Sequence, residues 1–316
     1  MELMRYVREM SKVLMLWPDI TEDIPKMIDK NYHEIVDIKN LYNTKYSGKI
    51  SRTVRKILSV MNLSTYFFFD DWVNRMEEYD IIIIHANQIN RTVPRTLRKK
   101  GFDHRIIYWY WNPVCNSISP KKISRKYCEL WSFDVNDCKK YDMKYNSTYY
   151  FNCLNAIEND VIYDMFFIGR DKGRYETIRC LESEIQSMGY STNFMIIKDA
   201  TSPSFGMFSK FLPYKDVIDF VKKSKCIVEF NQEGQMGLSL RVMEAIFYDK
   251  KIITNNHSIK NEVFYDENRI FIINDYNHKD IKKFINLDYC KIDDSIKEYY
   301  DFKNWISRFV KEVEKY

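Results

Sequence analysis

The chain has 316 residues, of which 45% are hydrophobic and 16% aromatic, and its formal net charge is +5. This composition excludes a disordered chain, and the presence of only 8 glycines and 7 prolines argues against a turn-rich all-β protein. The length predicts two domains.

The excess positive charge is concentrated in residues 91–105 and 121–126. Such basic segments suit a solvated surface, contact with an anionic membrane or binding of a phosphate-bearing substrate better than binding of nucleic acid.

The cysteines and the start of the chain bear on the cellular compartment. The seven cysteines are odd in number and include no C-x-x-C pair, which indicates reduced thiols and neither a disulfide framework nor a zinc site. The N-terminal stretch is charged up to Lys12, so no signal peptide is expected, and no apolar run approaches the ~18 residues of a spanning helix. We expect a cytoplasmic protein that could contact the inner face of the cell membrane peripherally.

The first half of the chain predicts a parallel α/β domain. Its clearest strand covers residues 80–86 (DIIIIHA), a continuous apolar run that is typical of a parallel strand buried on both faces. Residues 49–63 predict a helix, because Ile50, Val54 and Ile57 recur at helical spacing. The other expected strands cover residues 13–16, 106–111, 129–133 and 148–151, and the other expected helices cover residues 66–76 and 95–100.

The second half alternates more regularly between strands and helices. The polar residues 152–160 suggest a domain boundary, so we assign residues 1–155 to an N-terminal domain and 156–300 to a C-terminal domain. Residues 301–316 predict an amphipathic helix that could pack back on the N-terminal domain. Repeated strand–helix–strand units predict an α/β fold of two Rossmann-like domains, whose parallel sheets face a cleft.

The segment FFIGRDKGR, residues 166–174, is the first candidate site. Gly169 ends a buried strand, and a glycine lets the backbone approach a ligand closely. Arg170, Lys172 and Arg174 follow within five positions, and cations at the carboxyl end of a strand suit a diphosphate. The alternative is an ordinary polar loop that carries its cations on the surface.

Residues 227–255 hold the second candidate site, a strand followed by a glycine-bearing turn, a helix and another strand. Arg241 and Glu244 lie three residues apart on that helix and are therefore neighbours on its surface. They could form a simple surface ion pair, or Arg241 could neutralise a phosphate while Glu244 accepts hydrogen bonds from ribose hydroxyls. Backbone N–H groups near Gly237 and Ser239, at the helix start, would cap the same phosphate.

Together, FFIGRDKGR and the QMGLSLRVMEA helix resemble the C-terminal half of the GT-B glycosyltransferases, most of all the small bacterial enzymes that build capsule, exopolysaccharide or lipopolysaccharide. The resemblance implies a nucleotide-sugar donor on the second domain and a glycan or lipid-linked acceptor on the first. It also implies that fixed cations stabilise the leaving diphosphate, so that no metal or other cofactor is required. The common E-x7-E pair is not present, because Met236 stands eight residues before Glu244 and the nearest earlier acid is Glu233.

For an inverting reaction, the resemblance implies a general base on the first domain. His85 ends the strand DIIIIHA and titrates near neutral pH, and Asp19 follows the first strand. His85 could instead be a buried structural histidine, and Asp19 a turn or helix-capping residue. Trp109 and Trp111, at another strand end, could stack on an acceptor sugar or pack in the core.

We therefore predict a glycosyltransferase of surface polysaccharide synthesis. The alternatives are a non-hydrolysing nucleotide-sugar epimerase, a non-catalytic glycan-binding or partner subunit of the same fold and, less favoured, a basic nucleic-acid binder. Asp70 and Asp71 form an acidic pair for which a helix cap is favoured over a metal site. The residues do not define the donor nucleotide, the sugar, the acceptor or the stereochemical outcome.

Overall fold

The computed structural model describes residues 11–154, 160–231, 237–274 and 277–311. The chain divides into two compact units, Met1–Ser147 with Lys303–Tyr316 (unit 1) and Thr148–Phe302 (unit 2). The division thus falls after residue 147, shortly before the position at residue 155 that the sequence suggests. The seven cysteines all lie in the described residues, and none of them forms a disulfide. No helix among the described residues combines the length and apolarity that crossing a membrane requires.

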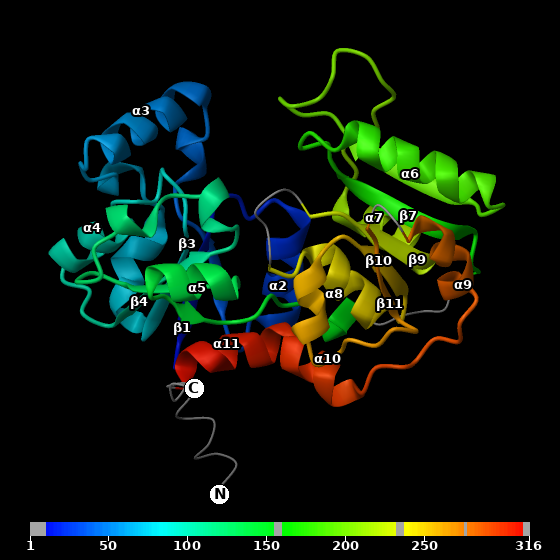
Figure 1. Cartoon of the computed structure of the whole chain (residues 1–316). Helices are drawn as coiled ribbons and strands as arrows, with labels where there is room; N and C mark the ends of the chain where they lie inside the picture. The colour runs from blue at the N-terminus through cyan, green and yellow to red at the C-terminus, as the bar shows by residue number, and fades with distance from the viewer. Residues whose placement is uncertain (1–10, 155–159, 232–236, 275–276, 312–316) are drawn as a thin grey trace, which may run out of the picture. The chain divides into compact units, whose positions relative to one another are not determined.

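Unit 1 contains a six-stranded parallel sheet with the strand order β2-β1-β3-β4-β5-β6 (Figure 1). Its strands are β1 (Val13–Trp17), β2 (Asp37–Asn40), β3 (Ile81–His85), β4 (Arg105–Tyr110), β5 (Glu129–Ser132) and β6 (Lys144–Tyr145). Its helices are α2 (Asp23–Tyr32), α3 (Lys49–Val60), α4 (Val93–Lys99), α5 (Val135–Tyr141) and, from Lys303 on, α11 (Phe302–Val310). His85 pairs in register with Trp109, so the carboxyl ends of β3 and β4 share one edge of the sheet.

Both faces of the unit 1 sheet are covered, as the apolar run of residues 81–84 predicts. One face of β1, β3 and β4 joins a buried cluster with α4. On the other face, the rings of Trp305 and Phe309 from α11 pack edge-on against Trp109, with centroid separations of 5.2 and 5.9 Å. The amphipathic stripe near the C-terminus is therefore buried on this sheet.

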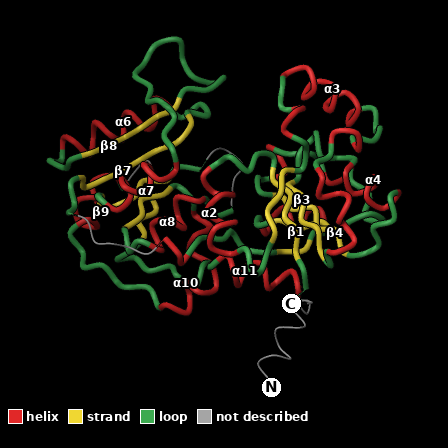
Figure 2. The backbone as a smooth tube through the Cα atoms, turned by 180° about the vertical axis from the view of Figure 1, so that it is seen from behind, coloured by secondary structure: helices red, strands yellow, loops and turns green. Residues whose placement is uncertain are grey.

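Unit 2 contains a five-stranded parallel sheet with the strand order β11-β10-β9-β7-β8. Its strands are β7 (Tyr163–Arg170), β8 (Thr192–Ile197), β9 (Ser224–Glu229), β10 (Lys251–Thr254) and β11 (Ile270–Ile272). Its helices are α6 (Tyr175–Ser187), α7 (Tyr214–Lys222), α8 (Leu240–Phe247), α9 (Ile281–Ile285) and α10 (Asp294–Tyr300). Figure 2 shows the strands in yellow and the flanking helices in red. Two parallel sheets flanked by helices confirm the predicted fold class.

The predicted strand over residues 148–151 is not formed. Only an isolated bridge joins Tyr150 to Asp301 there, and the last strand of the unit 1 sheet is the short β6. The chain thus passes into unit 2 at the point where the sequence predicts a further strand of the first domain.

The predicted helix over residues 66–76 is replaced by two 3₁₀ segments, Tyr66–Phe68 and Asp71–Glu78. Asp70 separates them with an extended backbone, with φ −79° and ψ 175°, which a continuous helix cannot contain. Its carboxylate accepts a hydrogen bond from the Asp71 N–H at 3.0 Å and another from Asn43 at 2.9 Å. The capping role favoured for this acidic pair is confirmed.

Candidate functional site

The strand order reverses at one place in each sheet. In unit 1 the reversal lies between β1 and β3, and in unit 2 it lies between β7 and β9. Open parallel sheets bind ligands outside the carboxyl ends of the strands that flank such a switch point. The last residues of these four strands are Trp17, His85, Arg170 and Glu229. Two of them, His85 and Arg170, are residues that the sequence predicts for catalysis and donor binding.

The turn after β7 contains two successive residues with left-handed backbone. Lys172 has φ 49° and Gly173 has φ 76°. This conformation costs a non-glycine residue roughly 1–2 kcal/mol, so the surrounding contacts must maintain it. One such contact is the hydrogen bond from the Lys172 N–H to the Asp199 carboxylate at 2.9 Å. The hydrogen bond to Asp199 therefore helps to fix the backbone conformation at Lys172, and with it the position from which the Lys172 side chain extends.

The Arg174 side chain stabilises the same turn through hydrogen bonds to the backbone. Its guanidinium donates to the backbone carbonyls of Asp171 at 3.0 Å, of Arg170 at 2.6 Å and of Phe230. A Cβ added at Gly169 would lie 3.3 Å from Cζ of the Phe167 ring, which is a tight contact, and at an ordinary 3.5 Å from the Nη2 atom of Arg174. Three of the five N–H groups of Arg174 thus bind backbone and join the β7 turn to the end of β9, and its predicted donor contact stays a prediction.

We expect Arg174→Ala to lower the free energy of unfolding by about 2–4 kcal/mol, because three carbonyls lose a charged donor. Arg174→Lys should recover only part of this loss, since an ammonium does not reproduce the planar fork of a guanidinium. Urea unfolding at constant pH measures both changes. A variant Arg174→Ala that unfolded like the wild type but lost nucleotide affinity would restore the predicted donor role.

Arg170 and Lys172 carry the remaining positive charge at this switch point. Both side chains are exposed, and neither makes a side-chain hydrogen bond or ion pair with any residue that the structure describes. Partial burial, together with repulsion from Arg174 and Arg170, lowers the pKa of Lys172, and the nearby Asp199 carboxylate opposes this fall. Three cations therefore crowd one turn, and an anion bound there would relieve their repulsion.

Glu229 is a residue of this region that the sequence patterns did not reveal. It is 3% exposed, its Oε2 atom accepts a hydrogen bond from the Thr254 hydroxyl, and its buried Oε1 atom has no hydrogen-bond partner among the described residues. Burial raises the pKa of Glu229, while the nearby Arg174 opposes that rise. The sequence signal that could have revealed Glu229 is an acidic residue within the otherwise apolar strand CIVEF. The carboxylate of Glu229 joins the end of β9 to the end of β10.

The helix α8 carries the Arg241–Glu244 pair, and Ser239 is its N-cap residue. The Ser239 side chain accepts a hydrogen bond from the Val242 N–H, and Gly237 is buried just before it. The ion pair at i,i+3 is present, but the prediction of a surface location is wrong. The side chain of Glu244 is 0% exposed and that of Arg241 is 17% exposed.

Glu244 belongs to a buried polar network. The Tyr214 hydroxyl donates to Glu244 Oε1 at 3.0 Å and lies 3.1 Å from the Tyr150 hydroxyl. Burial raises the pKa of Glu244 to about 7, against the opposing effect of Arg241. A ribose hydroxyl would need an exposed oxygen, which Glu244 does not present in this structure. Glu233, the nearest earlier acid, lies outside the described residues.

In unit 1, His85 lies among aromatic rings at the switch point. Its ring centroid is 4.5 Å from that of Trp17, which the sequence patterns did not single out, and 5.8 Å from that of Trp111. Nδ1 lies 3.2 Å from the Leu16 carbonyl, and because a carbonyl only accepts, Nδ1 carries the proton. Nε2 therefore holds the lone pair; this atom is buried, and it has no hydrogen-bond partner among the described residues. Burial lowers the pKa of His85 to about 4, so the ring is neutral at pH 7.

The other predicted residues of unit 1 take different places. Asp19 is exposed, and its Oδ1 accepts hydrogen bonds from the hydroxyl of Thr21 at 2.7 Å and from its N–H at 2.9 Å, which lower the Asp19 pKa. This is the turn role given above as its alternative. Trp109 is 1% exposed beneath α11, so the structure contradicts its predicted stacking on an acceptor sugar. Trp111 is partly exposed beside His85.

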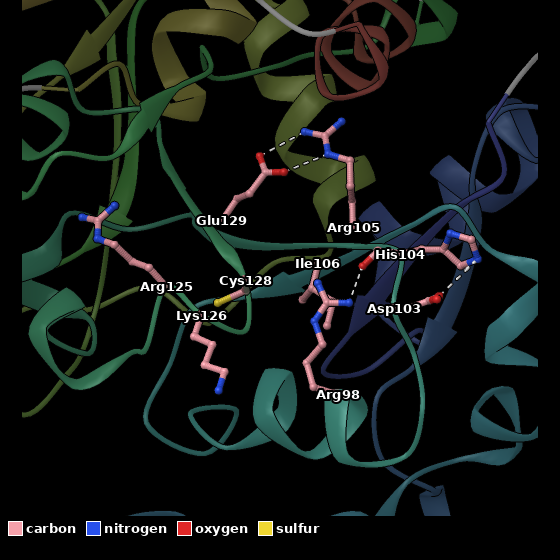
Figure 3. Close-up of a pocket in the computed structure, with 9 residues that line it drawn as sticks. All are labelled: Arg98, Asp103, His104, Arg105, Ile106, Arg125, Lys126, Cys128 and Glu129. Carbon is pink, nitrogen blue, oxygen red and sulfur yellow. Dashed lines mark hydrogen bonds and ion pairs between the residues drawn. The ribbon is translucent and has the colours of Figure 1, made fainter.

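A separate pocket of about 270 Å³ opens at the amino ends of β4 and β5 (Figure 3). Its side chains are mostly paired. Arg105 and Glu129 form a two-point ion pair with distances of 2.8 and 3.0 Å, and Arg98 donates to the His104 carbonyl at 2.7 Å. The pocket lies at the edge of the sheet opposite to His85, and none of the predicted site residues lines it.

No protein-family model and no curated protein matches the sequence. Solved structures do match. The apo form of the lipopolysaccharide outer core galactosyltransferase WaaB has 11% identity and a TM-score of 0.54, over 95% of this chain and 98% of that one. Anabaena HepE in complex with UDP and glucose has 10% identity and a TM-score of 0.52, over 95% and 98% of the two chains. Sucrose-phosphate synthase from Thermosynechococcus elongatus has 7% identity and a TM-score of 0.52, over 95% and 97%. These likenesses span both units, and the chain therefore has the two-domain GT-B fold.

Proposed function

We propose that the chain is a glycosyltransferase that moves a sugar from a nucleotide-sugar donor to a glycan or lipid-linked acceptor in surface polysaccharide synthesis. The observation that supports this most is the crowded pair of exposed cations, Arg170 and Lys172, at the switch point of unit 2. Two neighbours of the same fold favour this donor class. HepE was solved with UDP and glucose, and WaaB is described as a lipopolysaccharide galactosyltransferase.

Each unit would contribute one part of the reaction. Arg170 and Lys172, with backbone N–H groups at the start of α8, would hold the donor diphosphate and stabilise its charge as the glycosidic bond breaks. In an inverting reaction, the side chains around His85 would first have to move and expose the buried Nε2 atom, which would then take the proton from the acceptor hydroxyl while that oxygen forms the new bond to the sugar. The bonding electrons of the old bond would leave with the nucleoside diphosphate. Trp111 would pack against the acceptor sugar.

The cations at the β7 turn lead us to propose that transfer requires no metal ion. Arginine and lysine can stabilise the leaving diphosphate without a divalent cation. Sugar transfer should therefore continue in EDTA, and full loss of transfer in EDTA with recovery by added Mg²⁺ would contradict this part of the proposal. The site of action proposed here is the cytoplasmic face of the cell membrane, where lipid-linked acceptors would be presented.

A nucleotide-binding screen tests the donor proposal. Thermal-shift measurements with UDP-, GDP-, CMP- and dTDP-sugars should raise the unfolding temperature for one nucleotide class, because a bound ligand stabilises the folded state by mass action. No stabilisation by any of them would overturn the proposal. Turnover of the sugar donor into an isomer without an acceptor would instead identify an epimerase.

Substitutions at the β7 turn should weaken binding of the nucleotide found in that screen. Arg170→Ala and Lys172→Ala should each raise its dissociation constant at least about tenfold, because each removes a charge-assisted contact to phosphate. Their unfolding should match the wild type, since both side chains are exposed. Lys210→Ala, at an exposed position of the same unit, is the matched control. Unchanged nucleotide affinity in both test variants, by isothermal titration calorimetry, would remove the turn from the donor site.

A further inference from the structure

The helix α3 packs with its polar side inward. Arg55 and Ser59, one helical turn apart, are 6% and 0% exposed. The Arg55 guanidinium donates to the Tyr46 carbonyl at 2.7 Å and lies 4.5 Å from the centre of the Tyr42 ring, while the Ser59 hydroxyl donates to the Gln88 carbonyl. These contacts fix the rotation of the helix about its axis. The apolar side chains whose spacing predicted the helix therefore point away from the rest of unit 1, toward solvent.

The outward positions form one apolar surface, which we call the α3 surface. Ile50, Ile57 and Met61 are 82%, 52% and 62% exposed, and their spacing of seven and four residues places them on one side of the helix. Phe67, shortly after the helix, is 74% exposed. Figures 1 and 2 both show α3 at the outer margin of unit 1. A contiguous exposed apolar surface of this kind marks an interaction site.

The charged residues of the segment that carries the α3 surface are mainly basic. Residues 38–69 contain six lysines and arginines and no aspartate or glutamate, and the acidic pair Asp70 and Asp71 follows that segment. Lys49 and Lys56, seven residues apart, are exposed along one flank of the apolar side. Arg91 adds to them, because its side chain lies 3.5 Å from the Val60 carbonyl at the end of α3 and 3.4 Å from the Lys122 carbonyl. The two basic segments of the sequence thus adjoin the end of this helix.

We infer that the α3 surface docks on an anionic lipid bilayer. Helices that lie in a membrane interface combine an apolar side that enters the headgroup region with flanking lysines that contact anionic lipids. A second copy of the chain is disfavoured as the occupant, because the exposed Lys49 and Lys56 of two copies would bring like charges together. This inference goes beyond the proposed function, since lipid binding by α3 requires no sugar transfer.

Sedimentation of the full-length chain with phosphatidylcholine vesicles, with and without phosphatidylglycerol, tests the inference. The wild type should bind the anionic vesicles and bind the neutral ones weakly. Ile50→Gln with Ile57→Gln should lower the partition coefficient at least about tenfold, because two apolar side chains no longer enter the bilayer. Lys49→Gln with Lys56→Gln should lower it about 25-fold on anionic vesicles, at about fivefold for each lysine.

Matched controls come from unit 2. Val263→Gln changes an exposed apolar residue, and Lys282→Gln with Lys283→Gln changes two exposed lysines on a helix. Both should bind vesicles like the wild type. All variants should keep wild-type unfolding temperatures and nucleotide affinity, which separates a failure of the docking inference from a failure of the proposed function.

Three outcomes would overturn the docking inference. The first is equal partitioning of the wild type into neutral and anionic vesicles. The second is unchanged binding by the α3 variants. The third is a dimer in light scattering that becomes a monomer in the isoleucine variant, which would assign the α3 surface to a second copy of the chain.

Discussion

Replacing His85 by asparagine is expected to lower kcat for sugar transfer by about 10²–10⁴-fold while nucleotide affinity stays at the wild-type value. The asparagine amide can still donate to the Leu16 carbonyl, as His85 Nδ1 does at 3.2 Å, but the variant lacks the unpartnered Nε2 lone pair. Steady-state kinetics at saturating donor, together with calorimetric titration of the nucleotide, measure the two quantities separately.

The pH dependence of the wild type gives an independent readout of the same base. Because burial lowers the pKa of His85 to about 4, kcat/KM should fall only as the pH approaches 4. An unperturbed histidine would give a fall near pH about 6.5. Asp19→Asn is the control. If that variant lost transfer and His85→Asn kept it, the base would be Asp19, whose hydrogen bonds to Thr21 lower its pKa below 3.8.

Removing Arg241 is expected to destabilise the chain strongly at alkaline pH. Arg241→Ala leaves the Glu244 carboxylate buried without its cation, and loss of one partner of a buried pair costs about 3–5 kcal/mol. At mildly acidic pH the carboxyl is protonated, so the cost should be smaller. Urea unfolding of Arg241→Ala across this pH range measures the difference.

The double variant Arg241→Ala with Glu244→Gln should recover most of that lost stability. The glutamine amide keeps an acceptor for the Tyr214 hydroxyl, which donates to Glu244 Oε1 at 3.0 Å in the wild type. Arg170→Ala serves as the control, because it removes an exposed arginine from the same unit. Equal destabilisation by Arg241→Ala at acidic and alkaline pH would show that packing, and not an unpaired carboxylate, causes the loss.

His85 and Glu244 should affect stability in opposite directions over nearly the same pH range. The folded pKa of Glu244 is raised from 4.5 to about 7, so its contribution to stability falls as the pH rises through this range. The folded pKa of His85 is lowered from 6.5 to about 4, so its contribution falls as the pH decreases. Each shift corresponds to about 3 kcal/mol at full extent. Glu244→Gln should therefore leave stability rising with pH, and His85→Asn should leave it falling.

Much of the fold follows directly from the order of residues. Continuous apolar runs such as residues 81–84 predict parallel strands covered on both faces, and these strands lie at the centre of the unit 1 sheet. The turn FFIGRDKGR lies at the switch point of unit 2, because a strand that ends in glycine and cations reaches the same edge of a parallel sheet as its neighbours.

The roles of individual side chains were harder to predict from the sequence, because spacing along the chain does not reveal which residues from distant parts of the chain contact a given side chain. Arg170 and Arg174 are both cations of one turn, but only Arg174 meets the Phe230 carbonyl from the next strand of the sheet. Trp109 and Trp111 lie two residues apart, and only Trp109 is covered by α11, which comes from the far end of the sequence.

Helical spacing predicted α3 correctly but not the side on which it packs. Apolar residues at intervals of three and four usually mark the buried face of a helix. In α3 the hydrogen bonds of Arg55 and Ser59 to backbone carbonyls place the polar side inward. Those carbonyls come from Tyr46 and Gln88, and nothing in the periodicity of residues 49–63 indicates their presence.

The position of α11 has a consequence for the order in which the chain can assemble on the ribosome. The residues that cover Trp109 and Trp131 are Trp305 and Phe309, which are translated after every residue of unit 2. During synthesis, the aromatic face of the unit 1 sheet therefore stays uncovered until α11 has been translated. Unit 2 is thus the first of the two units whose hydrophobic core can be completed.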